Sequence, residues 1–150
     1  MIEILKASAG SGKTFNLARK YIELLLCNED RYAYRHILAV TFTNKATDEM
    51  KSRILKELYT LASTPEKSGY LAALMASGHF KTQSELQQKA HLVLCSILHD
   101  YSAFAVSTID RFFQQTLKAF SREIGQFASY QVELDKDSLM QRAWPGSWIR

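Results

Sequence analysis

The chain has 150 residues, which suits one domain and allows an apolar core without disulfides or bound metal. Its 19 Lys and Arg against 15 Asp and Glu leave a formal charge of +4, which permits a nucleic-acid partner without arguing for one. No run approaches the roughly 18 apolar residues of a membrane span, so we expect a cytoplasmic protein without a membrane partner. The two cysteines, Cys27 and Cys95, lie outside any Cys/His cluster, which argues against zinc.

The first third of the chain alternates apolar runs with helical patterns. Residues 2–5 form a short apolar run before a Gly/Ser-rich turn and predict a buried strand. From Lys13 the spacing becomes helical, and residues 37–42 predict a second strand that is buried nearly throughout. Asn44 is expected to cap the next helix. One apolar face is expected for the first helix, made of Leu17, Tyr21, Leu24 and Leu25.

Helical patterns dominate the rest. A loop at 64–68 precedes a short helix at 70–76 that stops near Gly78, a longer helix follows at 84–99, and residues 103–107 predict a third strand. Three apolar faces are expected: Met50, Ile54, Leu58 and Leu61 before the loop; Leu86, Ala90, Val93, Leu94, Ile97 and Leu98 in the longer helix; Ile109, Phe112, Phe113, Leu117 and Phe120 in a helix after the third strand. Beyond residue 126 the pattern weakens, although residues 130–134 alternate as a strand does.

The segment ASAGSGKT, residues 7–14, lies where the first predicted strand meets the first predicted helix. Backbone N–H groups can surround phosphates only where no side chain intrudes, and the start of a helix adds a positive dipole end. Lys13 offers a charge to the β and γ phosphates, and the Thr14 hydroxyl is a ligand for Mg²⁺. The sequence therefore predicts a P-loop for ATP, with Lys13 and Thr14 catalytic. Its contacts come from Ala9, Gly10, Ser11, Gly12, Lys13, Thr14 and Phe15.

Two positions of this loop need comment. Ala7 stands where the pattern G-x-x-x-x-G-K-[ST] has its first glycine. Phe15 is expected either to border the adenine or to pack as an ordinary helix residue. A P-loop alone does not distinguish kinases, transporters and motors, so the choice among them depends on other segments.

Residues 37–54, ILAVTFTNKATDEMKSRI, resemble motif Ia of the superfamily 1A DNA helicases. In that family a strand brings a Thr-Phe-Thr-Asn turn to single-stranded DNA. The resemblance implies DNA contacts from Thr41, Phe42, Thr43 and Asn44. Hydroxyl and amide groups beside a helix N-terminus can donate to phosphates, which fits this role. Phe42 either stacks on a base or, as is commoner for such a strand residue, packs in the core.

Residues 106–120, VSTIDRFFQQTLKAF, resemble motif Ib and imply DNA contacts from Thr108 and Arg111. Many family members carry a histidine where this chain has Asp110. A carboxylate cannot donate to a phosphate, so we expect Asp110 to cap the helix instead. Phe112 and Phe113 lie on the apolar stripe and are expected in the core.

The loop LKASAGSGKTF and the following YIELLL are most similar to the AddA nuclease-helicases and the beta subunit of exodeoxyribonuclease V. The adenine-binding glutamine segment usual in the UvrD/Rep branch does not fit in the six residues before Ala7. An apolar strand ending in Asp-Glu, which would hold Mg²⁺ and orient water, is also missing. We therefore expect a fragment that binds nucleotide weakly and does not turn over efficiently alone.

Pattern and resemblance together predict an α/β fold: a P-loop NTPase (RecA-like) parallel sheet with flanking helices, present as a partial domain with a helical insert. Residues 1–125 are expected to be the N-terminal part of the ATP-binding motor domain, with the insert at about 66–100. Residues 126–150 are expected to be the start of the next segment or a truncated or foreign tail.

The function implied is ATP- and Mg²⁺-dependent movement on single-stranded DNA and unwinding of double-stranded DNA in recombinational repair. The partners implied are a nuclease subunit, together with the remainder of the helicase chain. Two alternatives stay open. A P-loop kinase or small-molecule ATPase predicts no effect of DNA on nucleotide binding, and a motor remnant predicts DNA binding without hydrolysis.

Overall fold

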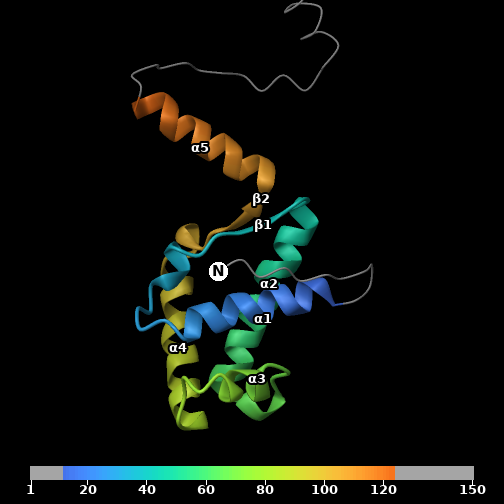
Figure 1. Cartoon of the computed structure of the whole chain (residues 1–150), viewed down its shortest axis with the longest axis vertical. Coiled ribbons are helices and arrows are strands. Elements are labelled where there is room, and N and C mark those ends of the chain that lie inside the picture. Colours follow the sequence, from blue (N-terminus) through green and yellow to red (C-terminus); the bar gives the residue numbers. More distant parts are fainter. Residues whose placement is uncertain (1–11, 124–150) are drawn as a thin grey trace, which may run out of the picture. The chain divides into compact units, whose positions relative to one another are not determined.

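The computed structural model describes residues 12–123, in which helices surround a two-stranded sheet (Figure 1). The α-helices are α1 (Lys13–Leu26), α2 (Asn44–Ser63), α3 (Leu71–Ala76), α4 (Gln83–His99) and α5 (Ile109–Glu123). The strands are β1 (Ala39–Thr41) and β2 (Val106–Thr108), and short 3₁₀ turns are η1 (Ala33–Arg35), η2 (Pro65–Lys67) and η3 (Tyr101–Ala103). The strands predicted at 2–5 and 130–134 lie outside the described residues.

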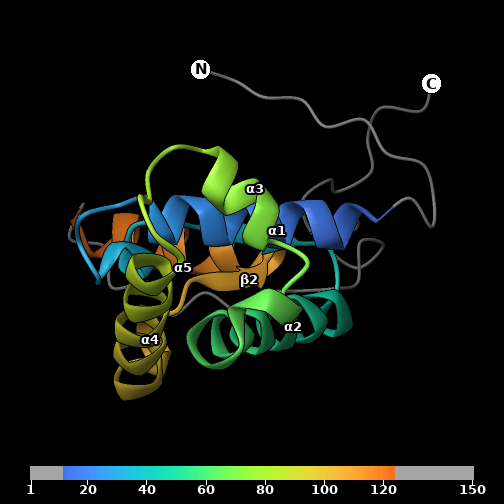
Figure 2. The same ribbon diagram turned by 90° about the horizontal axis from the view of Figure 1, so that it is seen from below.

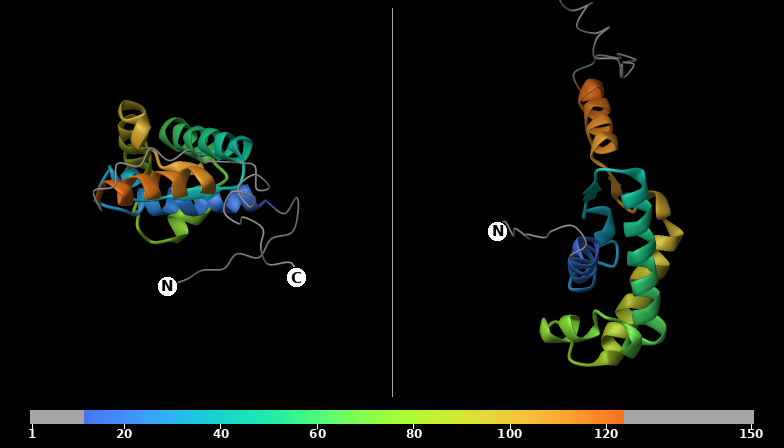
Figure 3. Two further views of the ribbon diagram at one scale, coloured as in Figure 1. Left: turned by 90° about the horizontal axis from the view of Figure 1, so that it is seen from above. Right: turned by 90° about the vertical axis from the view of Figure 1, so that its right-hand side faces the viewer.

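The chain divides into two compact units, Met1–Gln114 and Gln115–Arg150, with the boundary inside α5. In the first unit, α1 lies on one face of the sheet, and α2 and α4 lie on the other (Figures 2 and 3). Helices on both faces of a parallel sheet are the arrangement that the sequence predicted. The structure thus shows a helix-rich α/β unit with a small parallel sheet.

β1 and β2 run parallel in a register that pairs Ala39 with Val106 and Thr41 with Thr108. Parallel neighbours need a long crossover connection, which α2, α3 and α4 supply here. Both strands are shorter than predicted. The ladder of β1 covers three residues instead of 37–42. The second strand begins at Val106 because residues 101–103 form η3.

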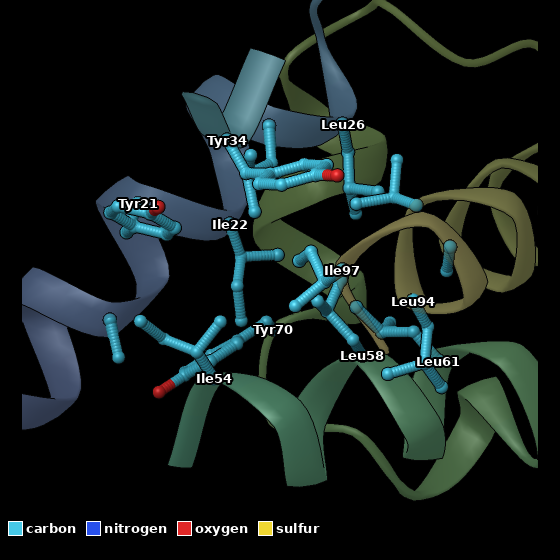
Figure 4. Packing of buried hydrophobic residues seen from close by; sticks show 14 of the residues in the cluster. Tyr21, Ile22, Leu26, Tyr34, Ile54, Leu58, Leu61, Tyr70, Leu94 and Ile97 are labelled. Atoms are coloured by element: carbon cyan, nitrogen blue, oxygen red, sulfur yellow. The ribbon is translucent and has the colours of Figure 1, made fainter. Parts of the chain in front are cut away.

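The core of this unit lies where α1, α2 and α4 meet (Figure 4). The predicted stripe of α2 is confirmed: Met50, Ile54, Leu58 and Leu61 are at most 1% exposed. Each such side chain stabilises the fold by about 1.5–3 kcal/mol through burial. Tyr34 adds a polar tie, since its buried hydroxyl donates to the Ser96 carbonyl of α4 at 2.9 Å.

The predicted face of α1 was partly wrong. Leu17 and Leu24 are 42% and 48% exposed, whereas Tyr21 and Leu25 are buried as expected. The covered face also takes in residues that the prediction did not choose, Ala18, Ile22 and Leu26. Because α1 is apolar around much of its circumference, periodicity alone did not show which edge of the stripe would meet α2 and α4.

Two further predicted helices, α4 and α5, are present, but not every position expected in the core is buried. In α4, Leu98 is 59% exposed, because no described element covers it enough to bury it. In α5, the stripe expected in the core is largely exposed, with Phe113 and Leu117 at 55% and Phe120 at 59%. An amphipathic pattern forms a helix, but its apolar face is buried only where another element covers it.

Candidate functional site

The described part of the predicted P-loop runs from Gly12 into the first turn of α1; Ala9, Gly10 and Ser11 lie outside the described residues. Gly12 has φ 74° and ψ 25°, a left-handed conformation that favours glycine, and α1 begins directly after it. Among the described residues, no side chain caps the first turn of α1, whose N–H groups have no partner within the helix itself. Lys13 is exposed and Thr14 is half-buried on this turn.

These features fit a bound nucleoside triphosphate with its Mg²⁺ ion. The uncapped N–H groups and the positive end of α1 suit anionic oxygens, and Lys13 adds a formal positive charge beside them. A threonine hydroxyl in this turn is a hard oxygen ligand of the kind that Mg²⁺ accepts.

Phe15 follows this turn and packs against residues from a distant part of the chain. Its ring meets the Tyr70 ring edge to face, with centroids 4.6 Å apart, and a Cβ added at Gly69 would lie 3.7 Å from it. The Tyr70 hydroxyl also donates to the Phe15 carbonyl at 3.1 Å. Phe15 thus packs against the connection between α2 and α3, while 37% of the residue stays exposed. The sequence had not singled out Tyr70, because the contact spans 55 residues and follows no local pattern.

The segments resembling motifs Ia and Ib meet at one edge of the sheet. Thr41 ends β1, Thr108 ends β2, and the two are register partners. Figure 1 shows the two strands side by side. Each strand end leads into the start of a helix, α2 or α5. In Figures 1 and 2 the first turns of α1 and α2 also point to the same side of the unit. The structure therefore gathers the predicted DNA contacts at the carboxyl ends of the strands.

The turn between β1 and α2 is fixed by threonine hydroxyls. Thr43 is the N-cap of α2, since its Oγ1 accepts from the Ala46 N–H at 3.1 Å. The prediction that Asn44 caps this helix was wrong, because Asn44 is already its first helical residue. Thr41 Oγ1 lies 3.1 Å from the Thr43 carbonyl and 2.6 Å from Thr47 Oγ1, and Thr47 also donates to the Thr43 carbonyl at 3.2 Å. The Thr41 hydroxyl is therefore engaged inside the turn.

Phe42 lies at the tip of this turn and is 86% exposed. The core position that was the commoner expectation for it is wrong. The ladder of β1 ends one residue earlier, at Thr41, so the Phe42 ring extends beyond the part of the strand that other elements cover. Its exposed face is free to meet a ligand from solvent.

At the end of β2, Thr108 Oγ1 accepts from the Arg111 N–H at 3.4 Å and so caps α5. The cap predicted for Asp110 was therefore misplaced. Asp110 lies exposed in the first turn, where a carboxylate favours the positive end of the helix. Arg111 is also exposed. Phe112 is half-buried and Phe113 largely exposed, so the core prediction was wrong for Phe113.

A groove of about 790 Å³ follows the polar face of α2, beyond the turn between β1 and α2. Its lining residues are Lys45, Asp48, Glu49, Ser52, Arg53, Lys56 and Glu57. The cations and carboxylates in this lining are equal in number, so the groove has no net charge to attract a phosphate backbone. We assign it no ligand.

Within residues 12–123, no helix is both long and apolar enough to cross a membrane. No group of three or more His, Cys, Asp and Glu side chains in that range lies close enough to hold a metal ion.

Comparison with known proteins shows which family the chain is similar to. The family described as the UvrD/REP helicase N-terminal domain matches residues 3–145. The RecB subunit of the RecBCD enzyme from Buchnera aphidicola is 28% identical over 160 residues, which cover 99% of this chain and 13% of that protein. The RecB subunit from Borreliella burgdorferi is 30% identical over 142 residues, covering 92% of this chain and 11% of that protein.

A shorter match joins the chain to another helicase. The ATP-dependent DNA helicase Rep from Buchnera aphidicola is 47% identical over 58 residues, covering 39% of this chain and 8% of that protein. The chain thus spans only a small part of each relative, 13% or less. No solved structure matches it significantly. These findings confirm the resemblance predicted from the sequence: the chain belongs to the UvrD/REP helicase N-terminal domain family.

Proposed function

We propose that the chain is the ATP-binding portion of an ATP-dependent DNA helicase or translocase. The full protein would couple ATP hydrolysis to movement on single-stranded DNA and to unwinding of the duplex. The observation that carries this proposal is the register of β1 and β2. It brings Thr41 and Thr108, where the strands end within the two segments resembling DNA-contacting motifs, to one edge of the sheet. The family match supports it.

The nucleotide is proposed to bind at the start of α1. Backbone N–H groups of Ala9, Gly10, Ser11 and Gly12 would surround the phosphates, and Phe15 would lie beside the site. Lys13 would neutralise charge on the β and γ phosphates, and Thr14 would hold Mg²⁺. When bound, MgATP supplies the phosphoryl group whose transfer to water releases the free energy for movement. Interactions that strengthen as charge develops on that group lower the barrier most.

The DNA is proposed to lie across the carboxyl edge of the sheet. Asn44 and Arg111 are exposed there and carry donors for phosphate oxygens. The N-cap role of Thr43 uses its oxygen as an acceptor and leaves its hydroxyl proton for DNA. Thr108 occupies the equivalent place at α5, whereas Thr41 would act mainly by holding the turn in shape. Phe42 would stack on a base, an interaction worth about 1–3 kcal/mol.

The names of the relatives suggest a cellular setting. One matching protein is named for the RecBCD enzyme, and another, from Natranaerobius thermophilus, is named as part of an ATP-dependent helicase/nuclease. We infer a role in recombinational DNA repair in the cytoplasm, where the partners would be a nuclease subunit, together with the remainder of a helicase chain. An Asp-Glu pair and the second motor lobe would come from that remainder.

The proposal is tested by measuring ATP hydrolysis by the full-length protein with and without single-stranded DNA. We expect stimulation by DNA and a loss of about 10²-fold or more in Lys13→Ala, since that change removes a charge that stabilises the transition state. Lys81→Ala, at an exposed lysine before α4, is the control and should hydrolyse normally.

The outcomes separate the alternatives. Hydrolysis that ignores DNA would contradict the helicase proposal and favour a small-molecule ATPase or kinase. DNA binding without hydrolysis would favour a motor remnant. Normal hydrolysis by Lys13→Ala would contradict the site. Residues 1–150 alone are expected to show no efficient turnover, with or without DNA.

A further inference from the structure

Tyr70 is wholly buried and makes two separate contacts with the first turn of α1. Its hydroxyl donates to the Phe15 carbonyl at 3.1 Å, and its ring packs against the Phe15 ring at 4.6 Å. In an α-helix that carbonyl already accepts from the N–H four residues on. The second hydrogen bond is therefore not needed to satisfy the carbonyl, and its effect is to hold α1 against the connection between α2 and α3.

The turn that carries Tyr70 is itself tied to α2. The Ser68 hydroxyl donates to Glu57 Oε2 at 3.0 Å, and the Tyr70 N–H donates to Ser68 Oγ at 3.2 Å. These two bonds, with the bond from Tyr70 to Phe15, form a continuous series from the middle of α2 to the start of α1. The start of α1 is therefore joined to α2 through side chains as well as through the chain itself.

The hydroxyl of Tyr70 remains a donor across the physiological pH range. Burial raises the pKa of Tyr70 above its ordinary value of 10, and the Glu57 carboxylate raises it further. The nearby Arg53 and Arg19 guanidinium groups act in the opposite direction. The net upward shift keeps the proton on the oxygen, which suits a permanent structural tie rather than a switch.

We propose that Tyr70 is a positioning residue of the nucleotide site, which holds the first turn of α1, and with it Lys13 and Thr14, where the phosphates require them. The inference rests on the proposed function, since it assumes that this turn binds a nucleotide. It is based on the position of Phe15, which directly follows Thr14 in the chain. Tyr70 contacts both the ring and the carbonyl of Phe15. Misplacing a binding group by about 1 Å is enough to weaken its interactions strongly.

The test is Tyr70→Phe in the full-length protein, which keeps the ring and removes only the hydroxyl. Loss of one hydrogen bond that orders the site should raise the KM for MgATP about three- to tenfold. The kcat at saturating MgATP and single-stranded DNA should change less than twofold. In hydrogen exchange, the amides of the first turns of α1 should exchange faster than in the unaltered protein.

Tyr34→Phe is the matched control. Tyr34 is also fully buried and also donates to a backbone carbonyl, that of Ser96, but it lies between η1 and α4. Both variants should lose similar thermal stability, whereas only Tyr70→Phe should raise the KM. Equal KM values for Tyr70→Phe and the unaltered protein, or equal increases in both variants, would overturn the inference.

Ser68→Ala covers the case in which Tyr70→Phe does not fold. It removes the bond to Glu57 and the bond from the Tyr70 N–H but keeps the Tyr70 side chain and its hydroxyl, so a smaller KM increase in the same direction is expected. An unchanged KM in that variant would also count against the inference. An unaltered protein that binds no MgATP at all would overturn the proposed function together with this inference, whereas failure of the variants alone would overturn only the inference.

Discussion

Thr41 and Thr108 lie opposite each other as the last register pair of the parallel sheet. Each begins a turn into a helix, and a threonine hydroxyl caps that helix in both cases: Thr43 for α2 and Thr108 for α5. Two segments that are distant in the sequence therefore present equivalent groups at one edge. A single DNA strand along this edge would meet both, so changes in either segment should affect the same binding measurement.

Phe42→Ala should lower the affinity for single-stranded DNA and leave folding nearly unchanged. The ring is 86% exposed, so its removal should shift the free energy of unfolding by no more than about 0.5 kcal/mol. Loss of one stacked base should cost about 1–3 kcal/mol in binding, measured by anisotropy of a labelled oligonucleotide. Tyr59→Ala, at an exposed aromatic residue farther along α2, should change neither quantity. Undiminished DNA affinity in Phe42→Ala would argue against stacking.

Thr43→Ala and Thr82→Ala remove equivalent N-caps from two helices. Thr43 accepts from the Ala46 N–H at 3.1 Å, and Thr82 accepts from the Glu85 N–H at 3.2 Å. Each change should destabilise the protein by about 0.5–2 kcal/mol, seen as a lower thermal midpoint. Only Thr43→Ala should also weaken DNA binding, and Thr43→Ser should restore both properties. If the two alanine variants bound DNA equally well, Thr43 would have only a structural role.

Gly12→Ala should weaken nucleotide binding through the backbone rather than through a clash. Gly12 has φ 74°, and an added Cβ would have the Phe15 Cβ as its neighbour at an ordinary 3.9 Å. Holding alanine in the left-handed region costs about 1–2 kcal/mol, so MgATP affinity should fall roughly 5- to 30-fold if the loop shifts to relieve it. Titration calorimetry measures this directly.

Gly78→Ala provides the control for that change. Gly78 has φ 75° and open space around it, and it lies after α3. The same backbone strain should therefore lower the thermal midpoint while leaving MgATP affinity unchanged. A loss of affinity in both variants would mean that general destabilisation, not loop geometry, accounts for the effect.

Tyr21→Phe should make the protein less sensitive to alkali. Burial raises the pKa of Tyr21 well above its ordinary value of 10, so above pH 10 the unfolded chain releases a proton that the folded chain keeps. The free energy of unfolding should then fall by up to about 1.4 kcal/mol per pH unit for this group. In urea unfolding between pH 9 and pH 11, the free energy of unfolding should therefore fall less steeply with pH for the variant than for the unaltered protein. At pH 7 it should cost little, because the bond to the Ile37 carbonyl is 3.4 Å long. An identical decline in both proteins would contradict this assignment.

Sequence patterns predicted elements well where the physics is local. The spacing of Met50, Ile54, Leu58 and Leu61 specifies one narrow stripe, and the whole stripe is buried. Gly78 ends a helix because its left-handed backbone conformation suits glycine, a property of the residue itself. The start of α1 after Gly12 followed from the same kind of argument.

Predictions were weaker where burial depends on a partner from elsewhere in the chain. Leu24 and Leu98 have the right periodicity, but no described neighbour covers them enough to bury them. Phe42 belongs to an apolar run whose ladder ends one residue before it. The contact between Tyr70 and Phe15 depends on a turn whose position is set by α2. No spacing in the sequence predicts that contact.

The hydrogen bond from Tyr34 to Ser96 joins residues that are 62 positions apart, and α1 precedes both of them. The first described helix of this unit therefore has its apolar face completely covered only when α4 has followed α2 out of the ribosome. At about 5–20 residues per second, 62 residues take roughly 3–12 s to synthesise. During that time the apolar face of α1, with Ile22, Leu25 and Leu26, can pack against α2 but not yet against α4, so part of it stays exposed to water.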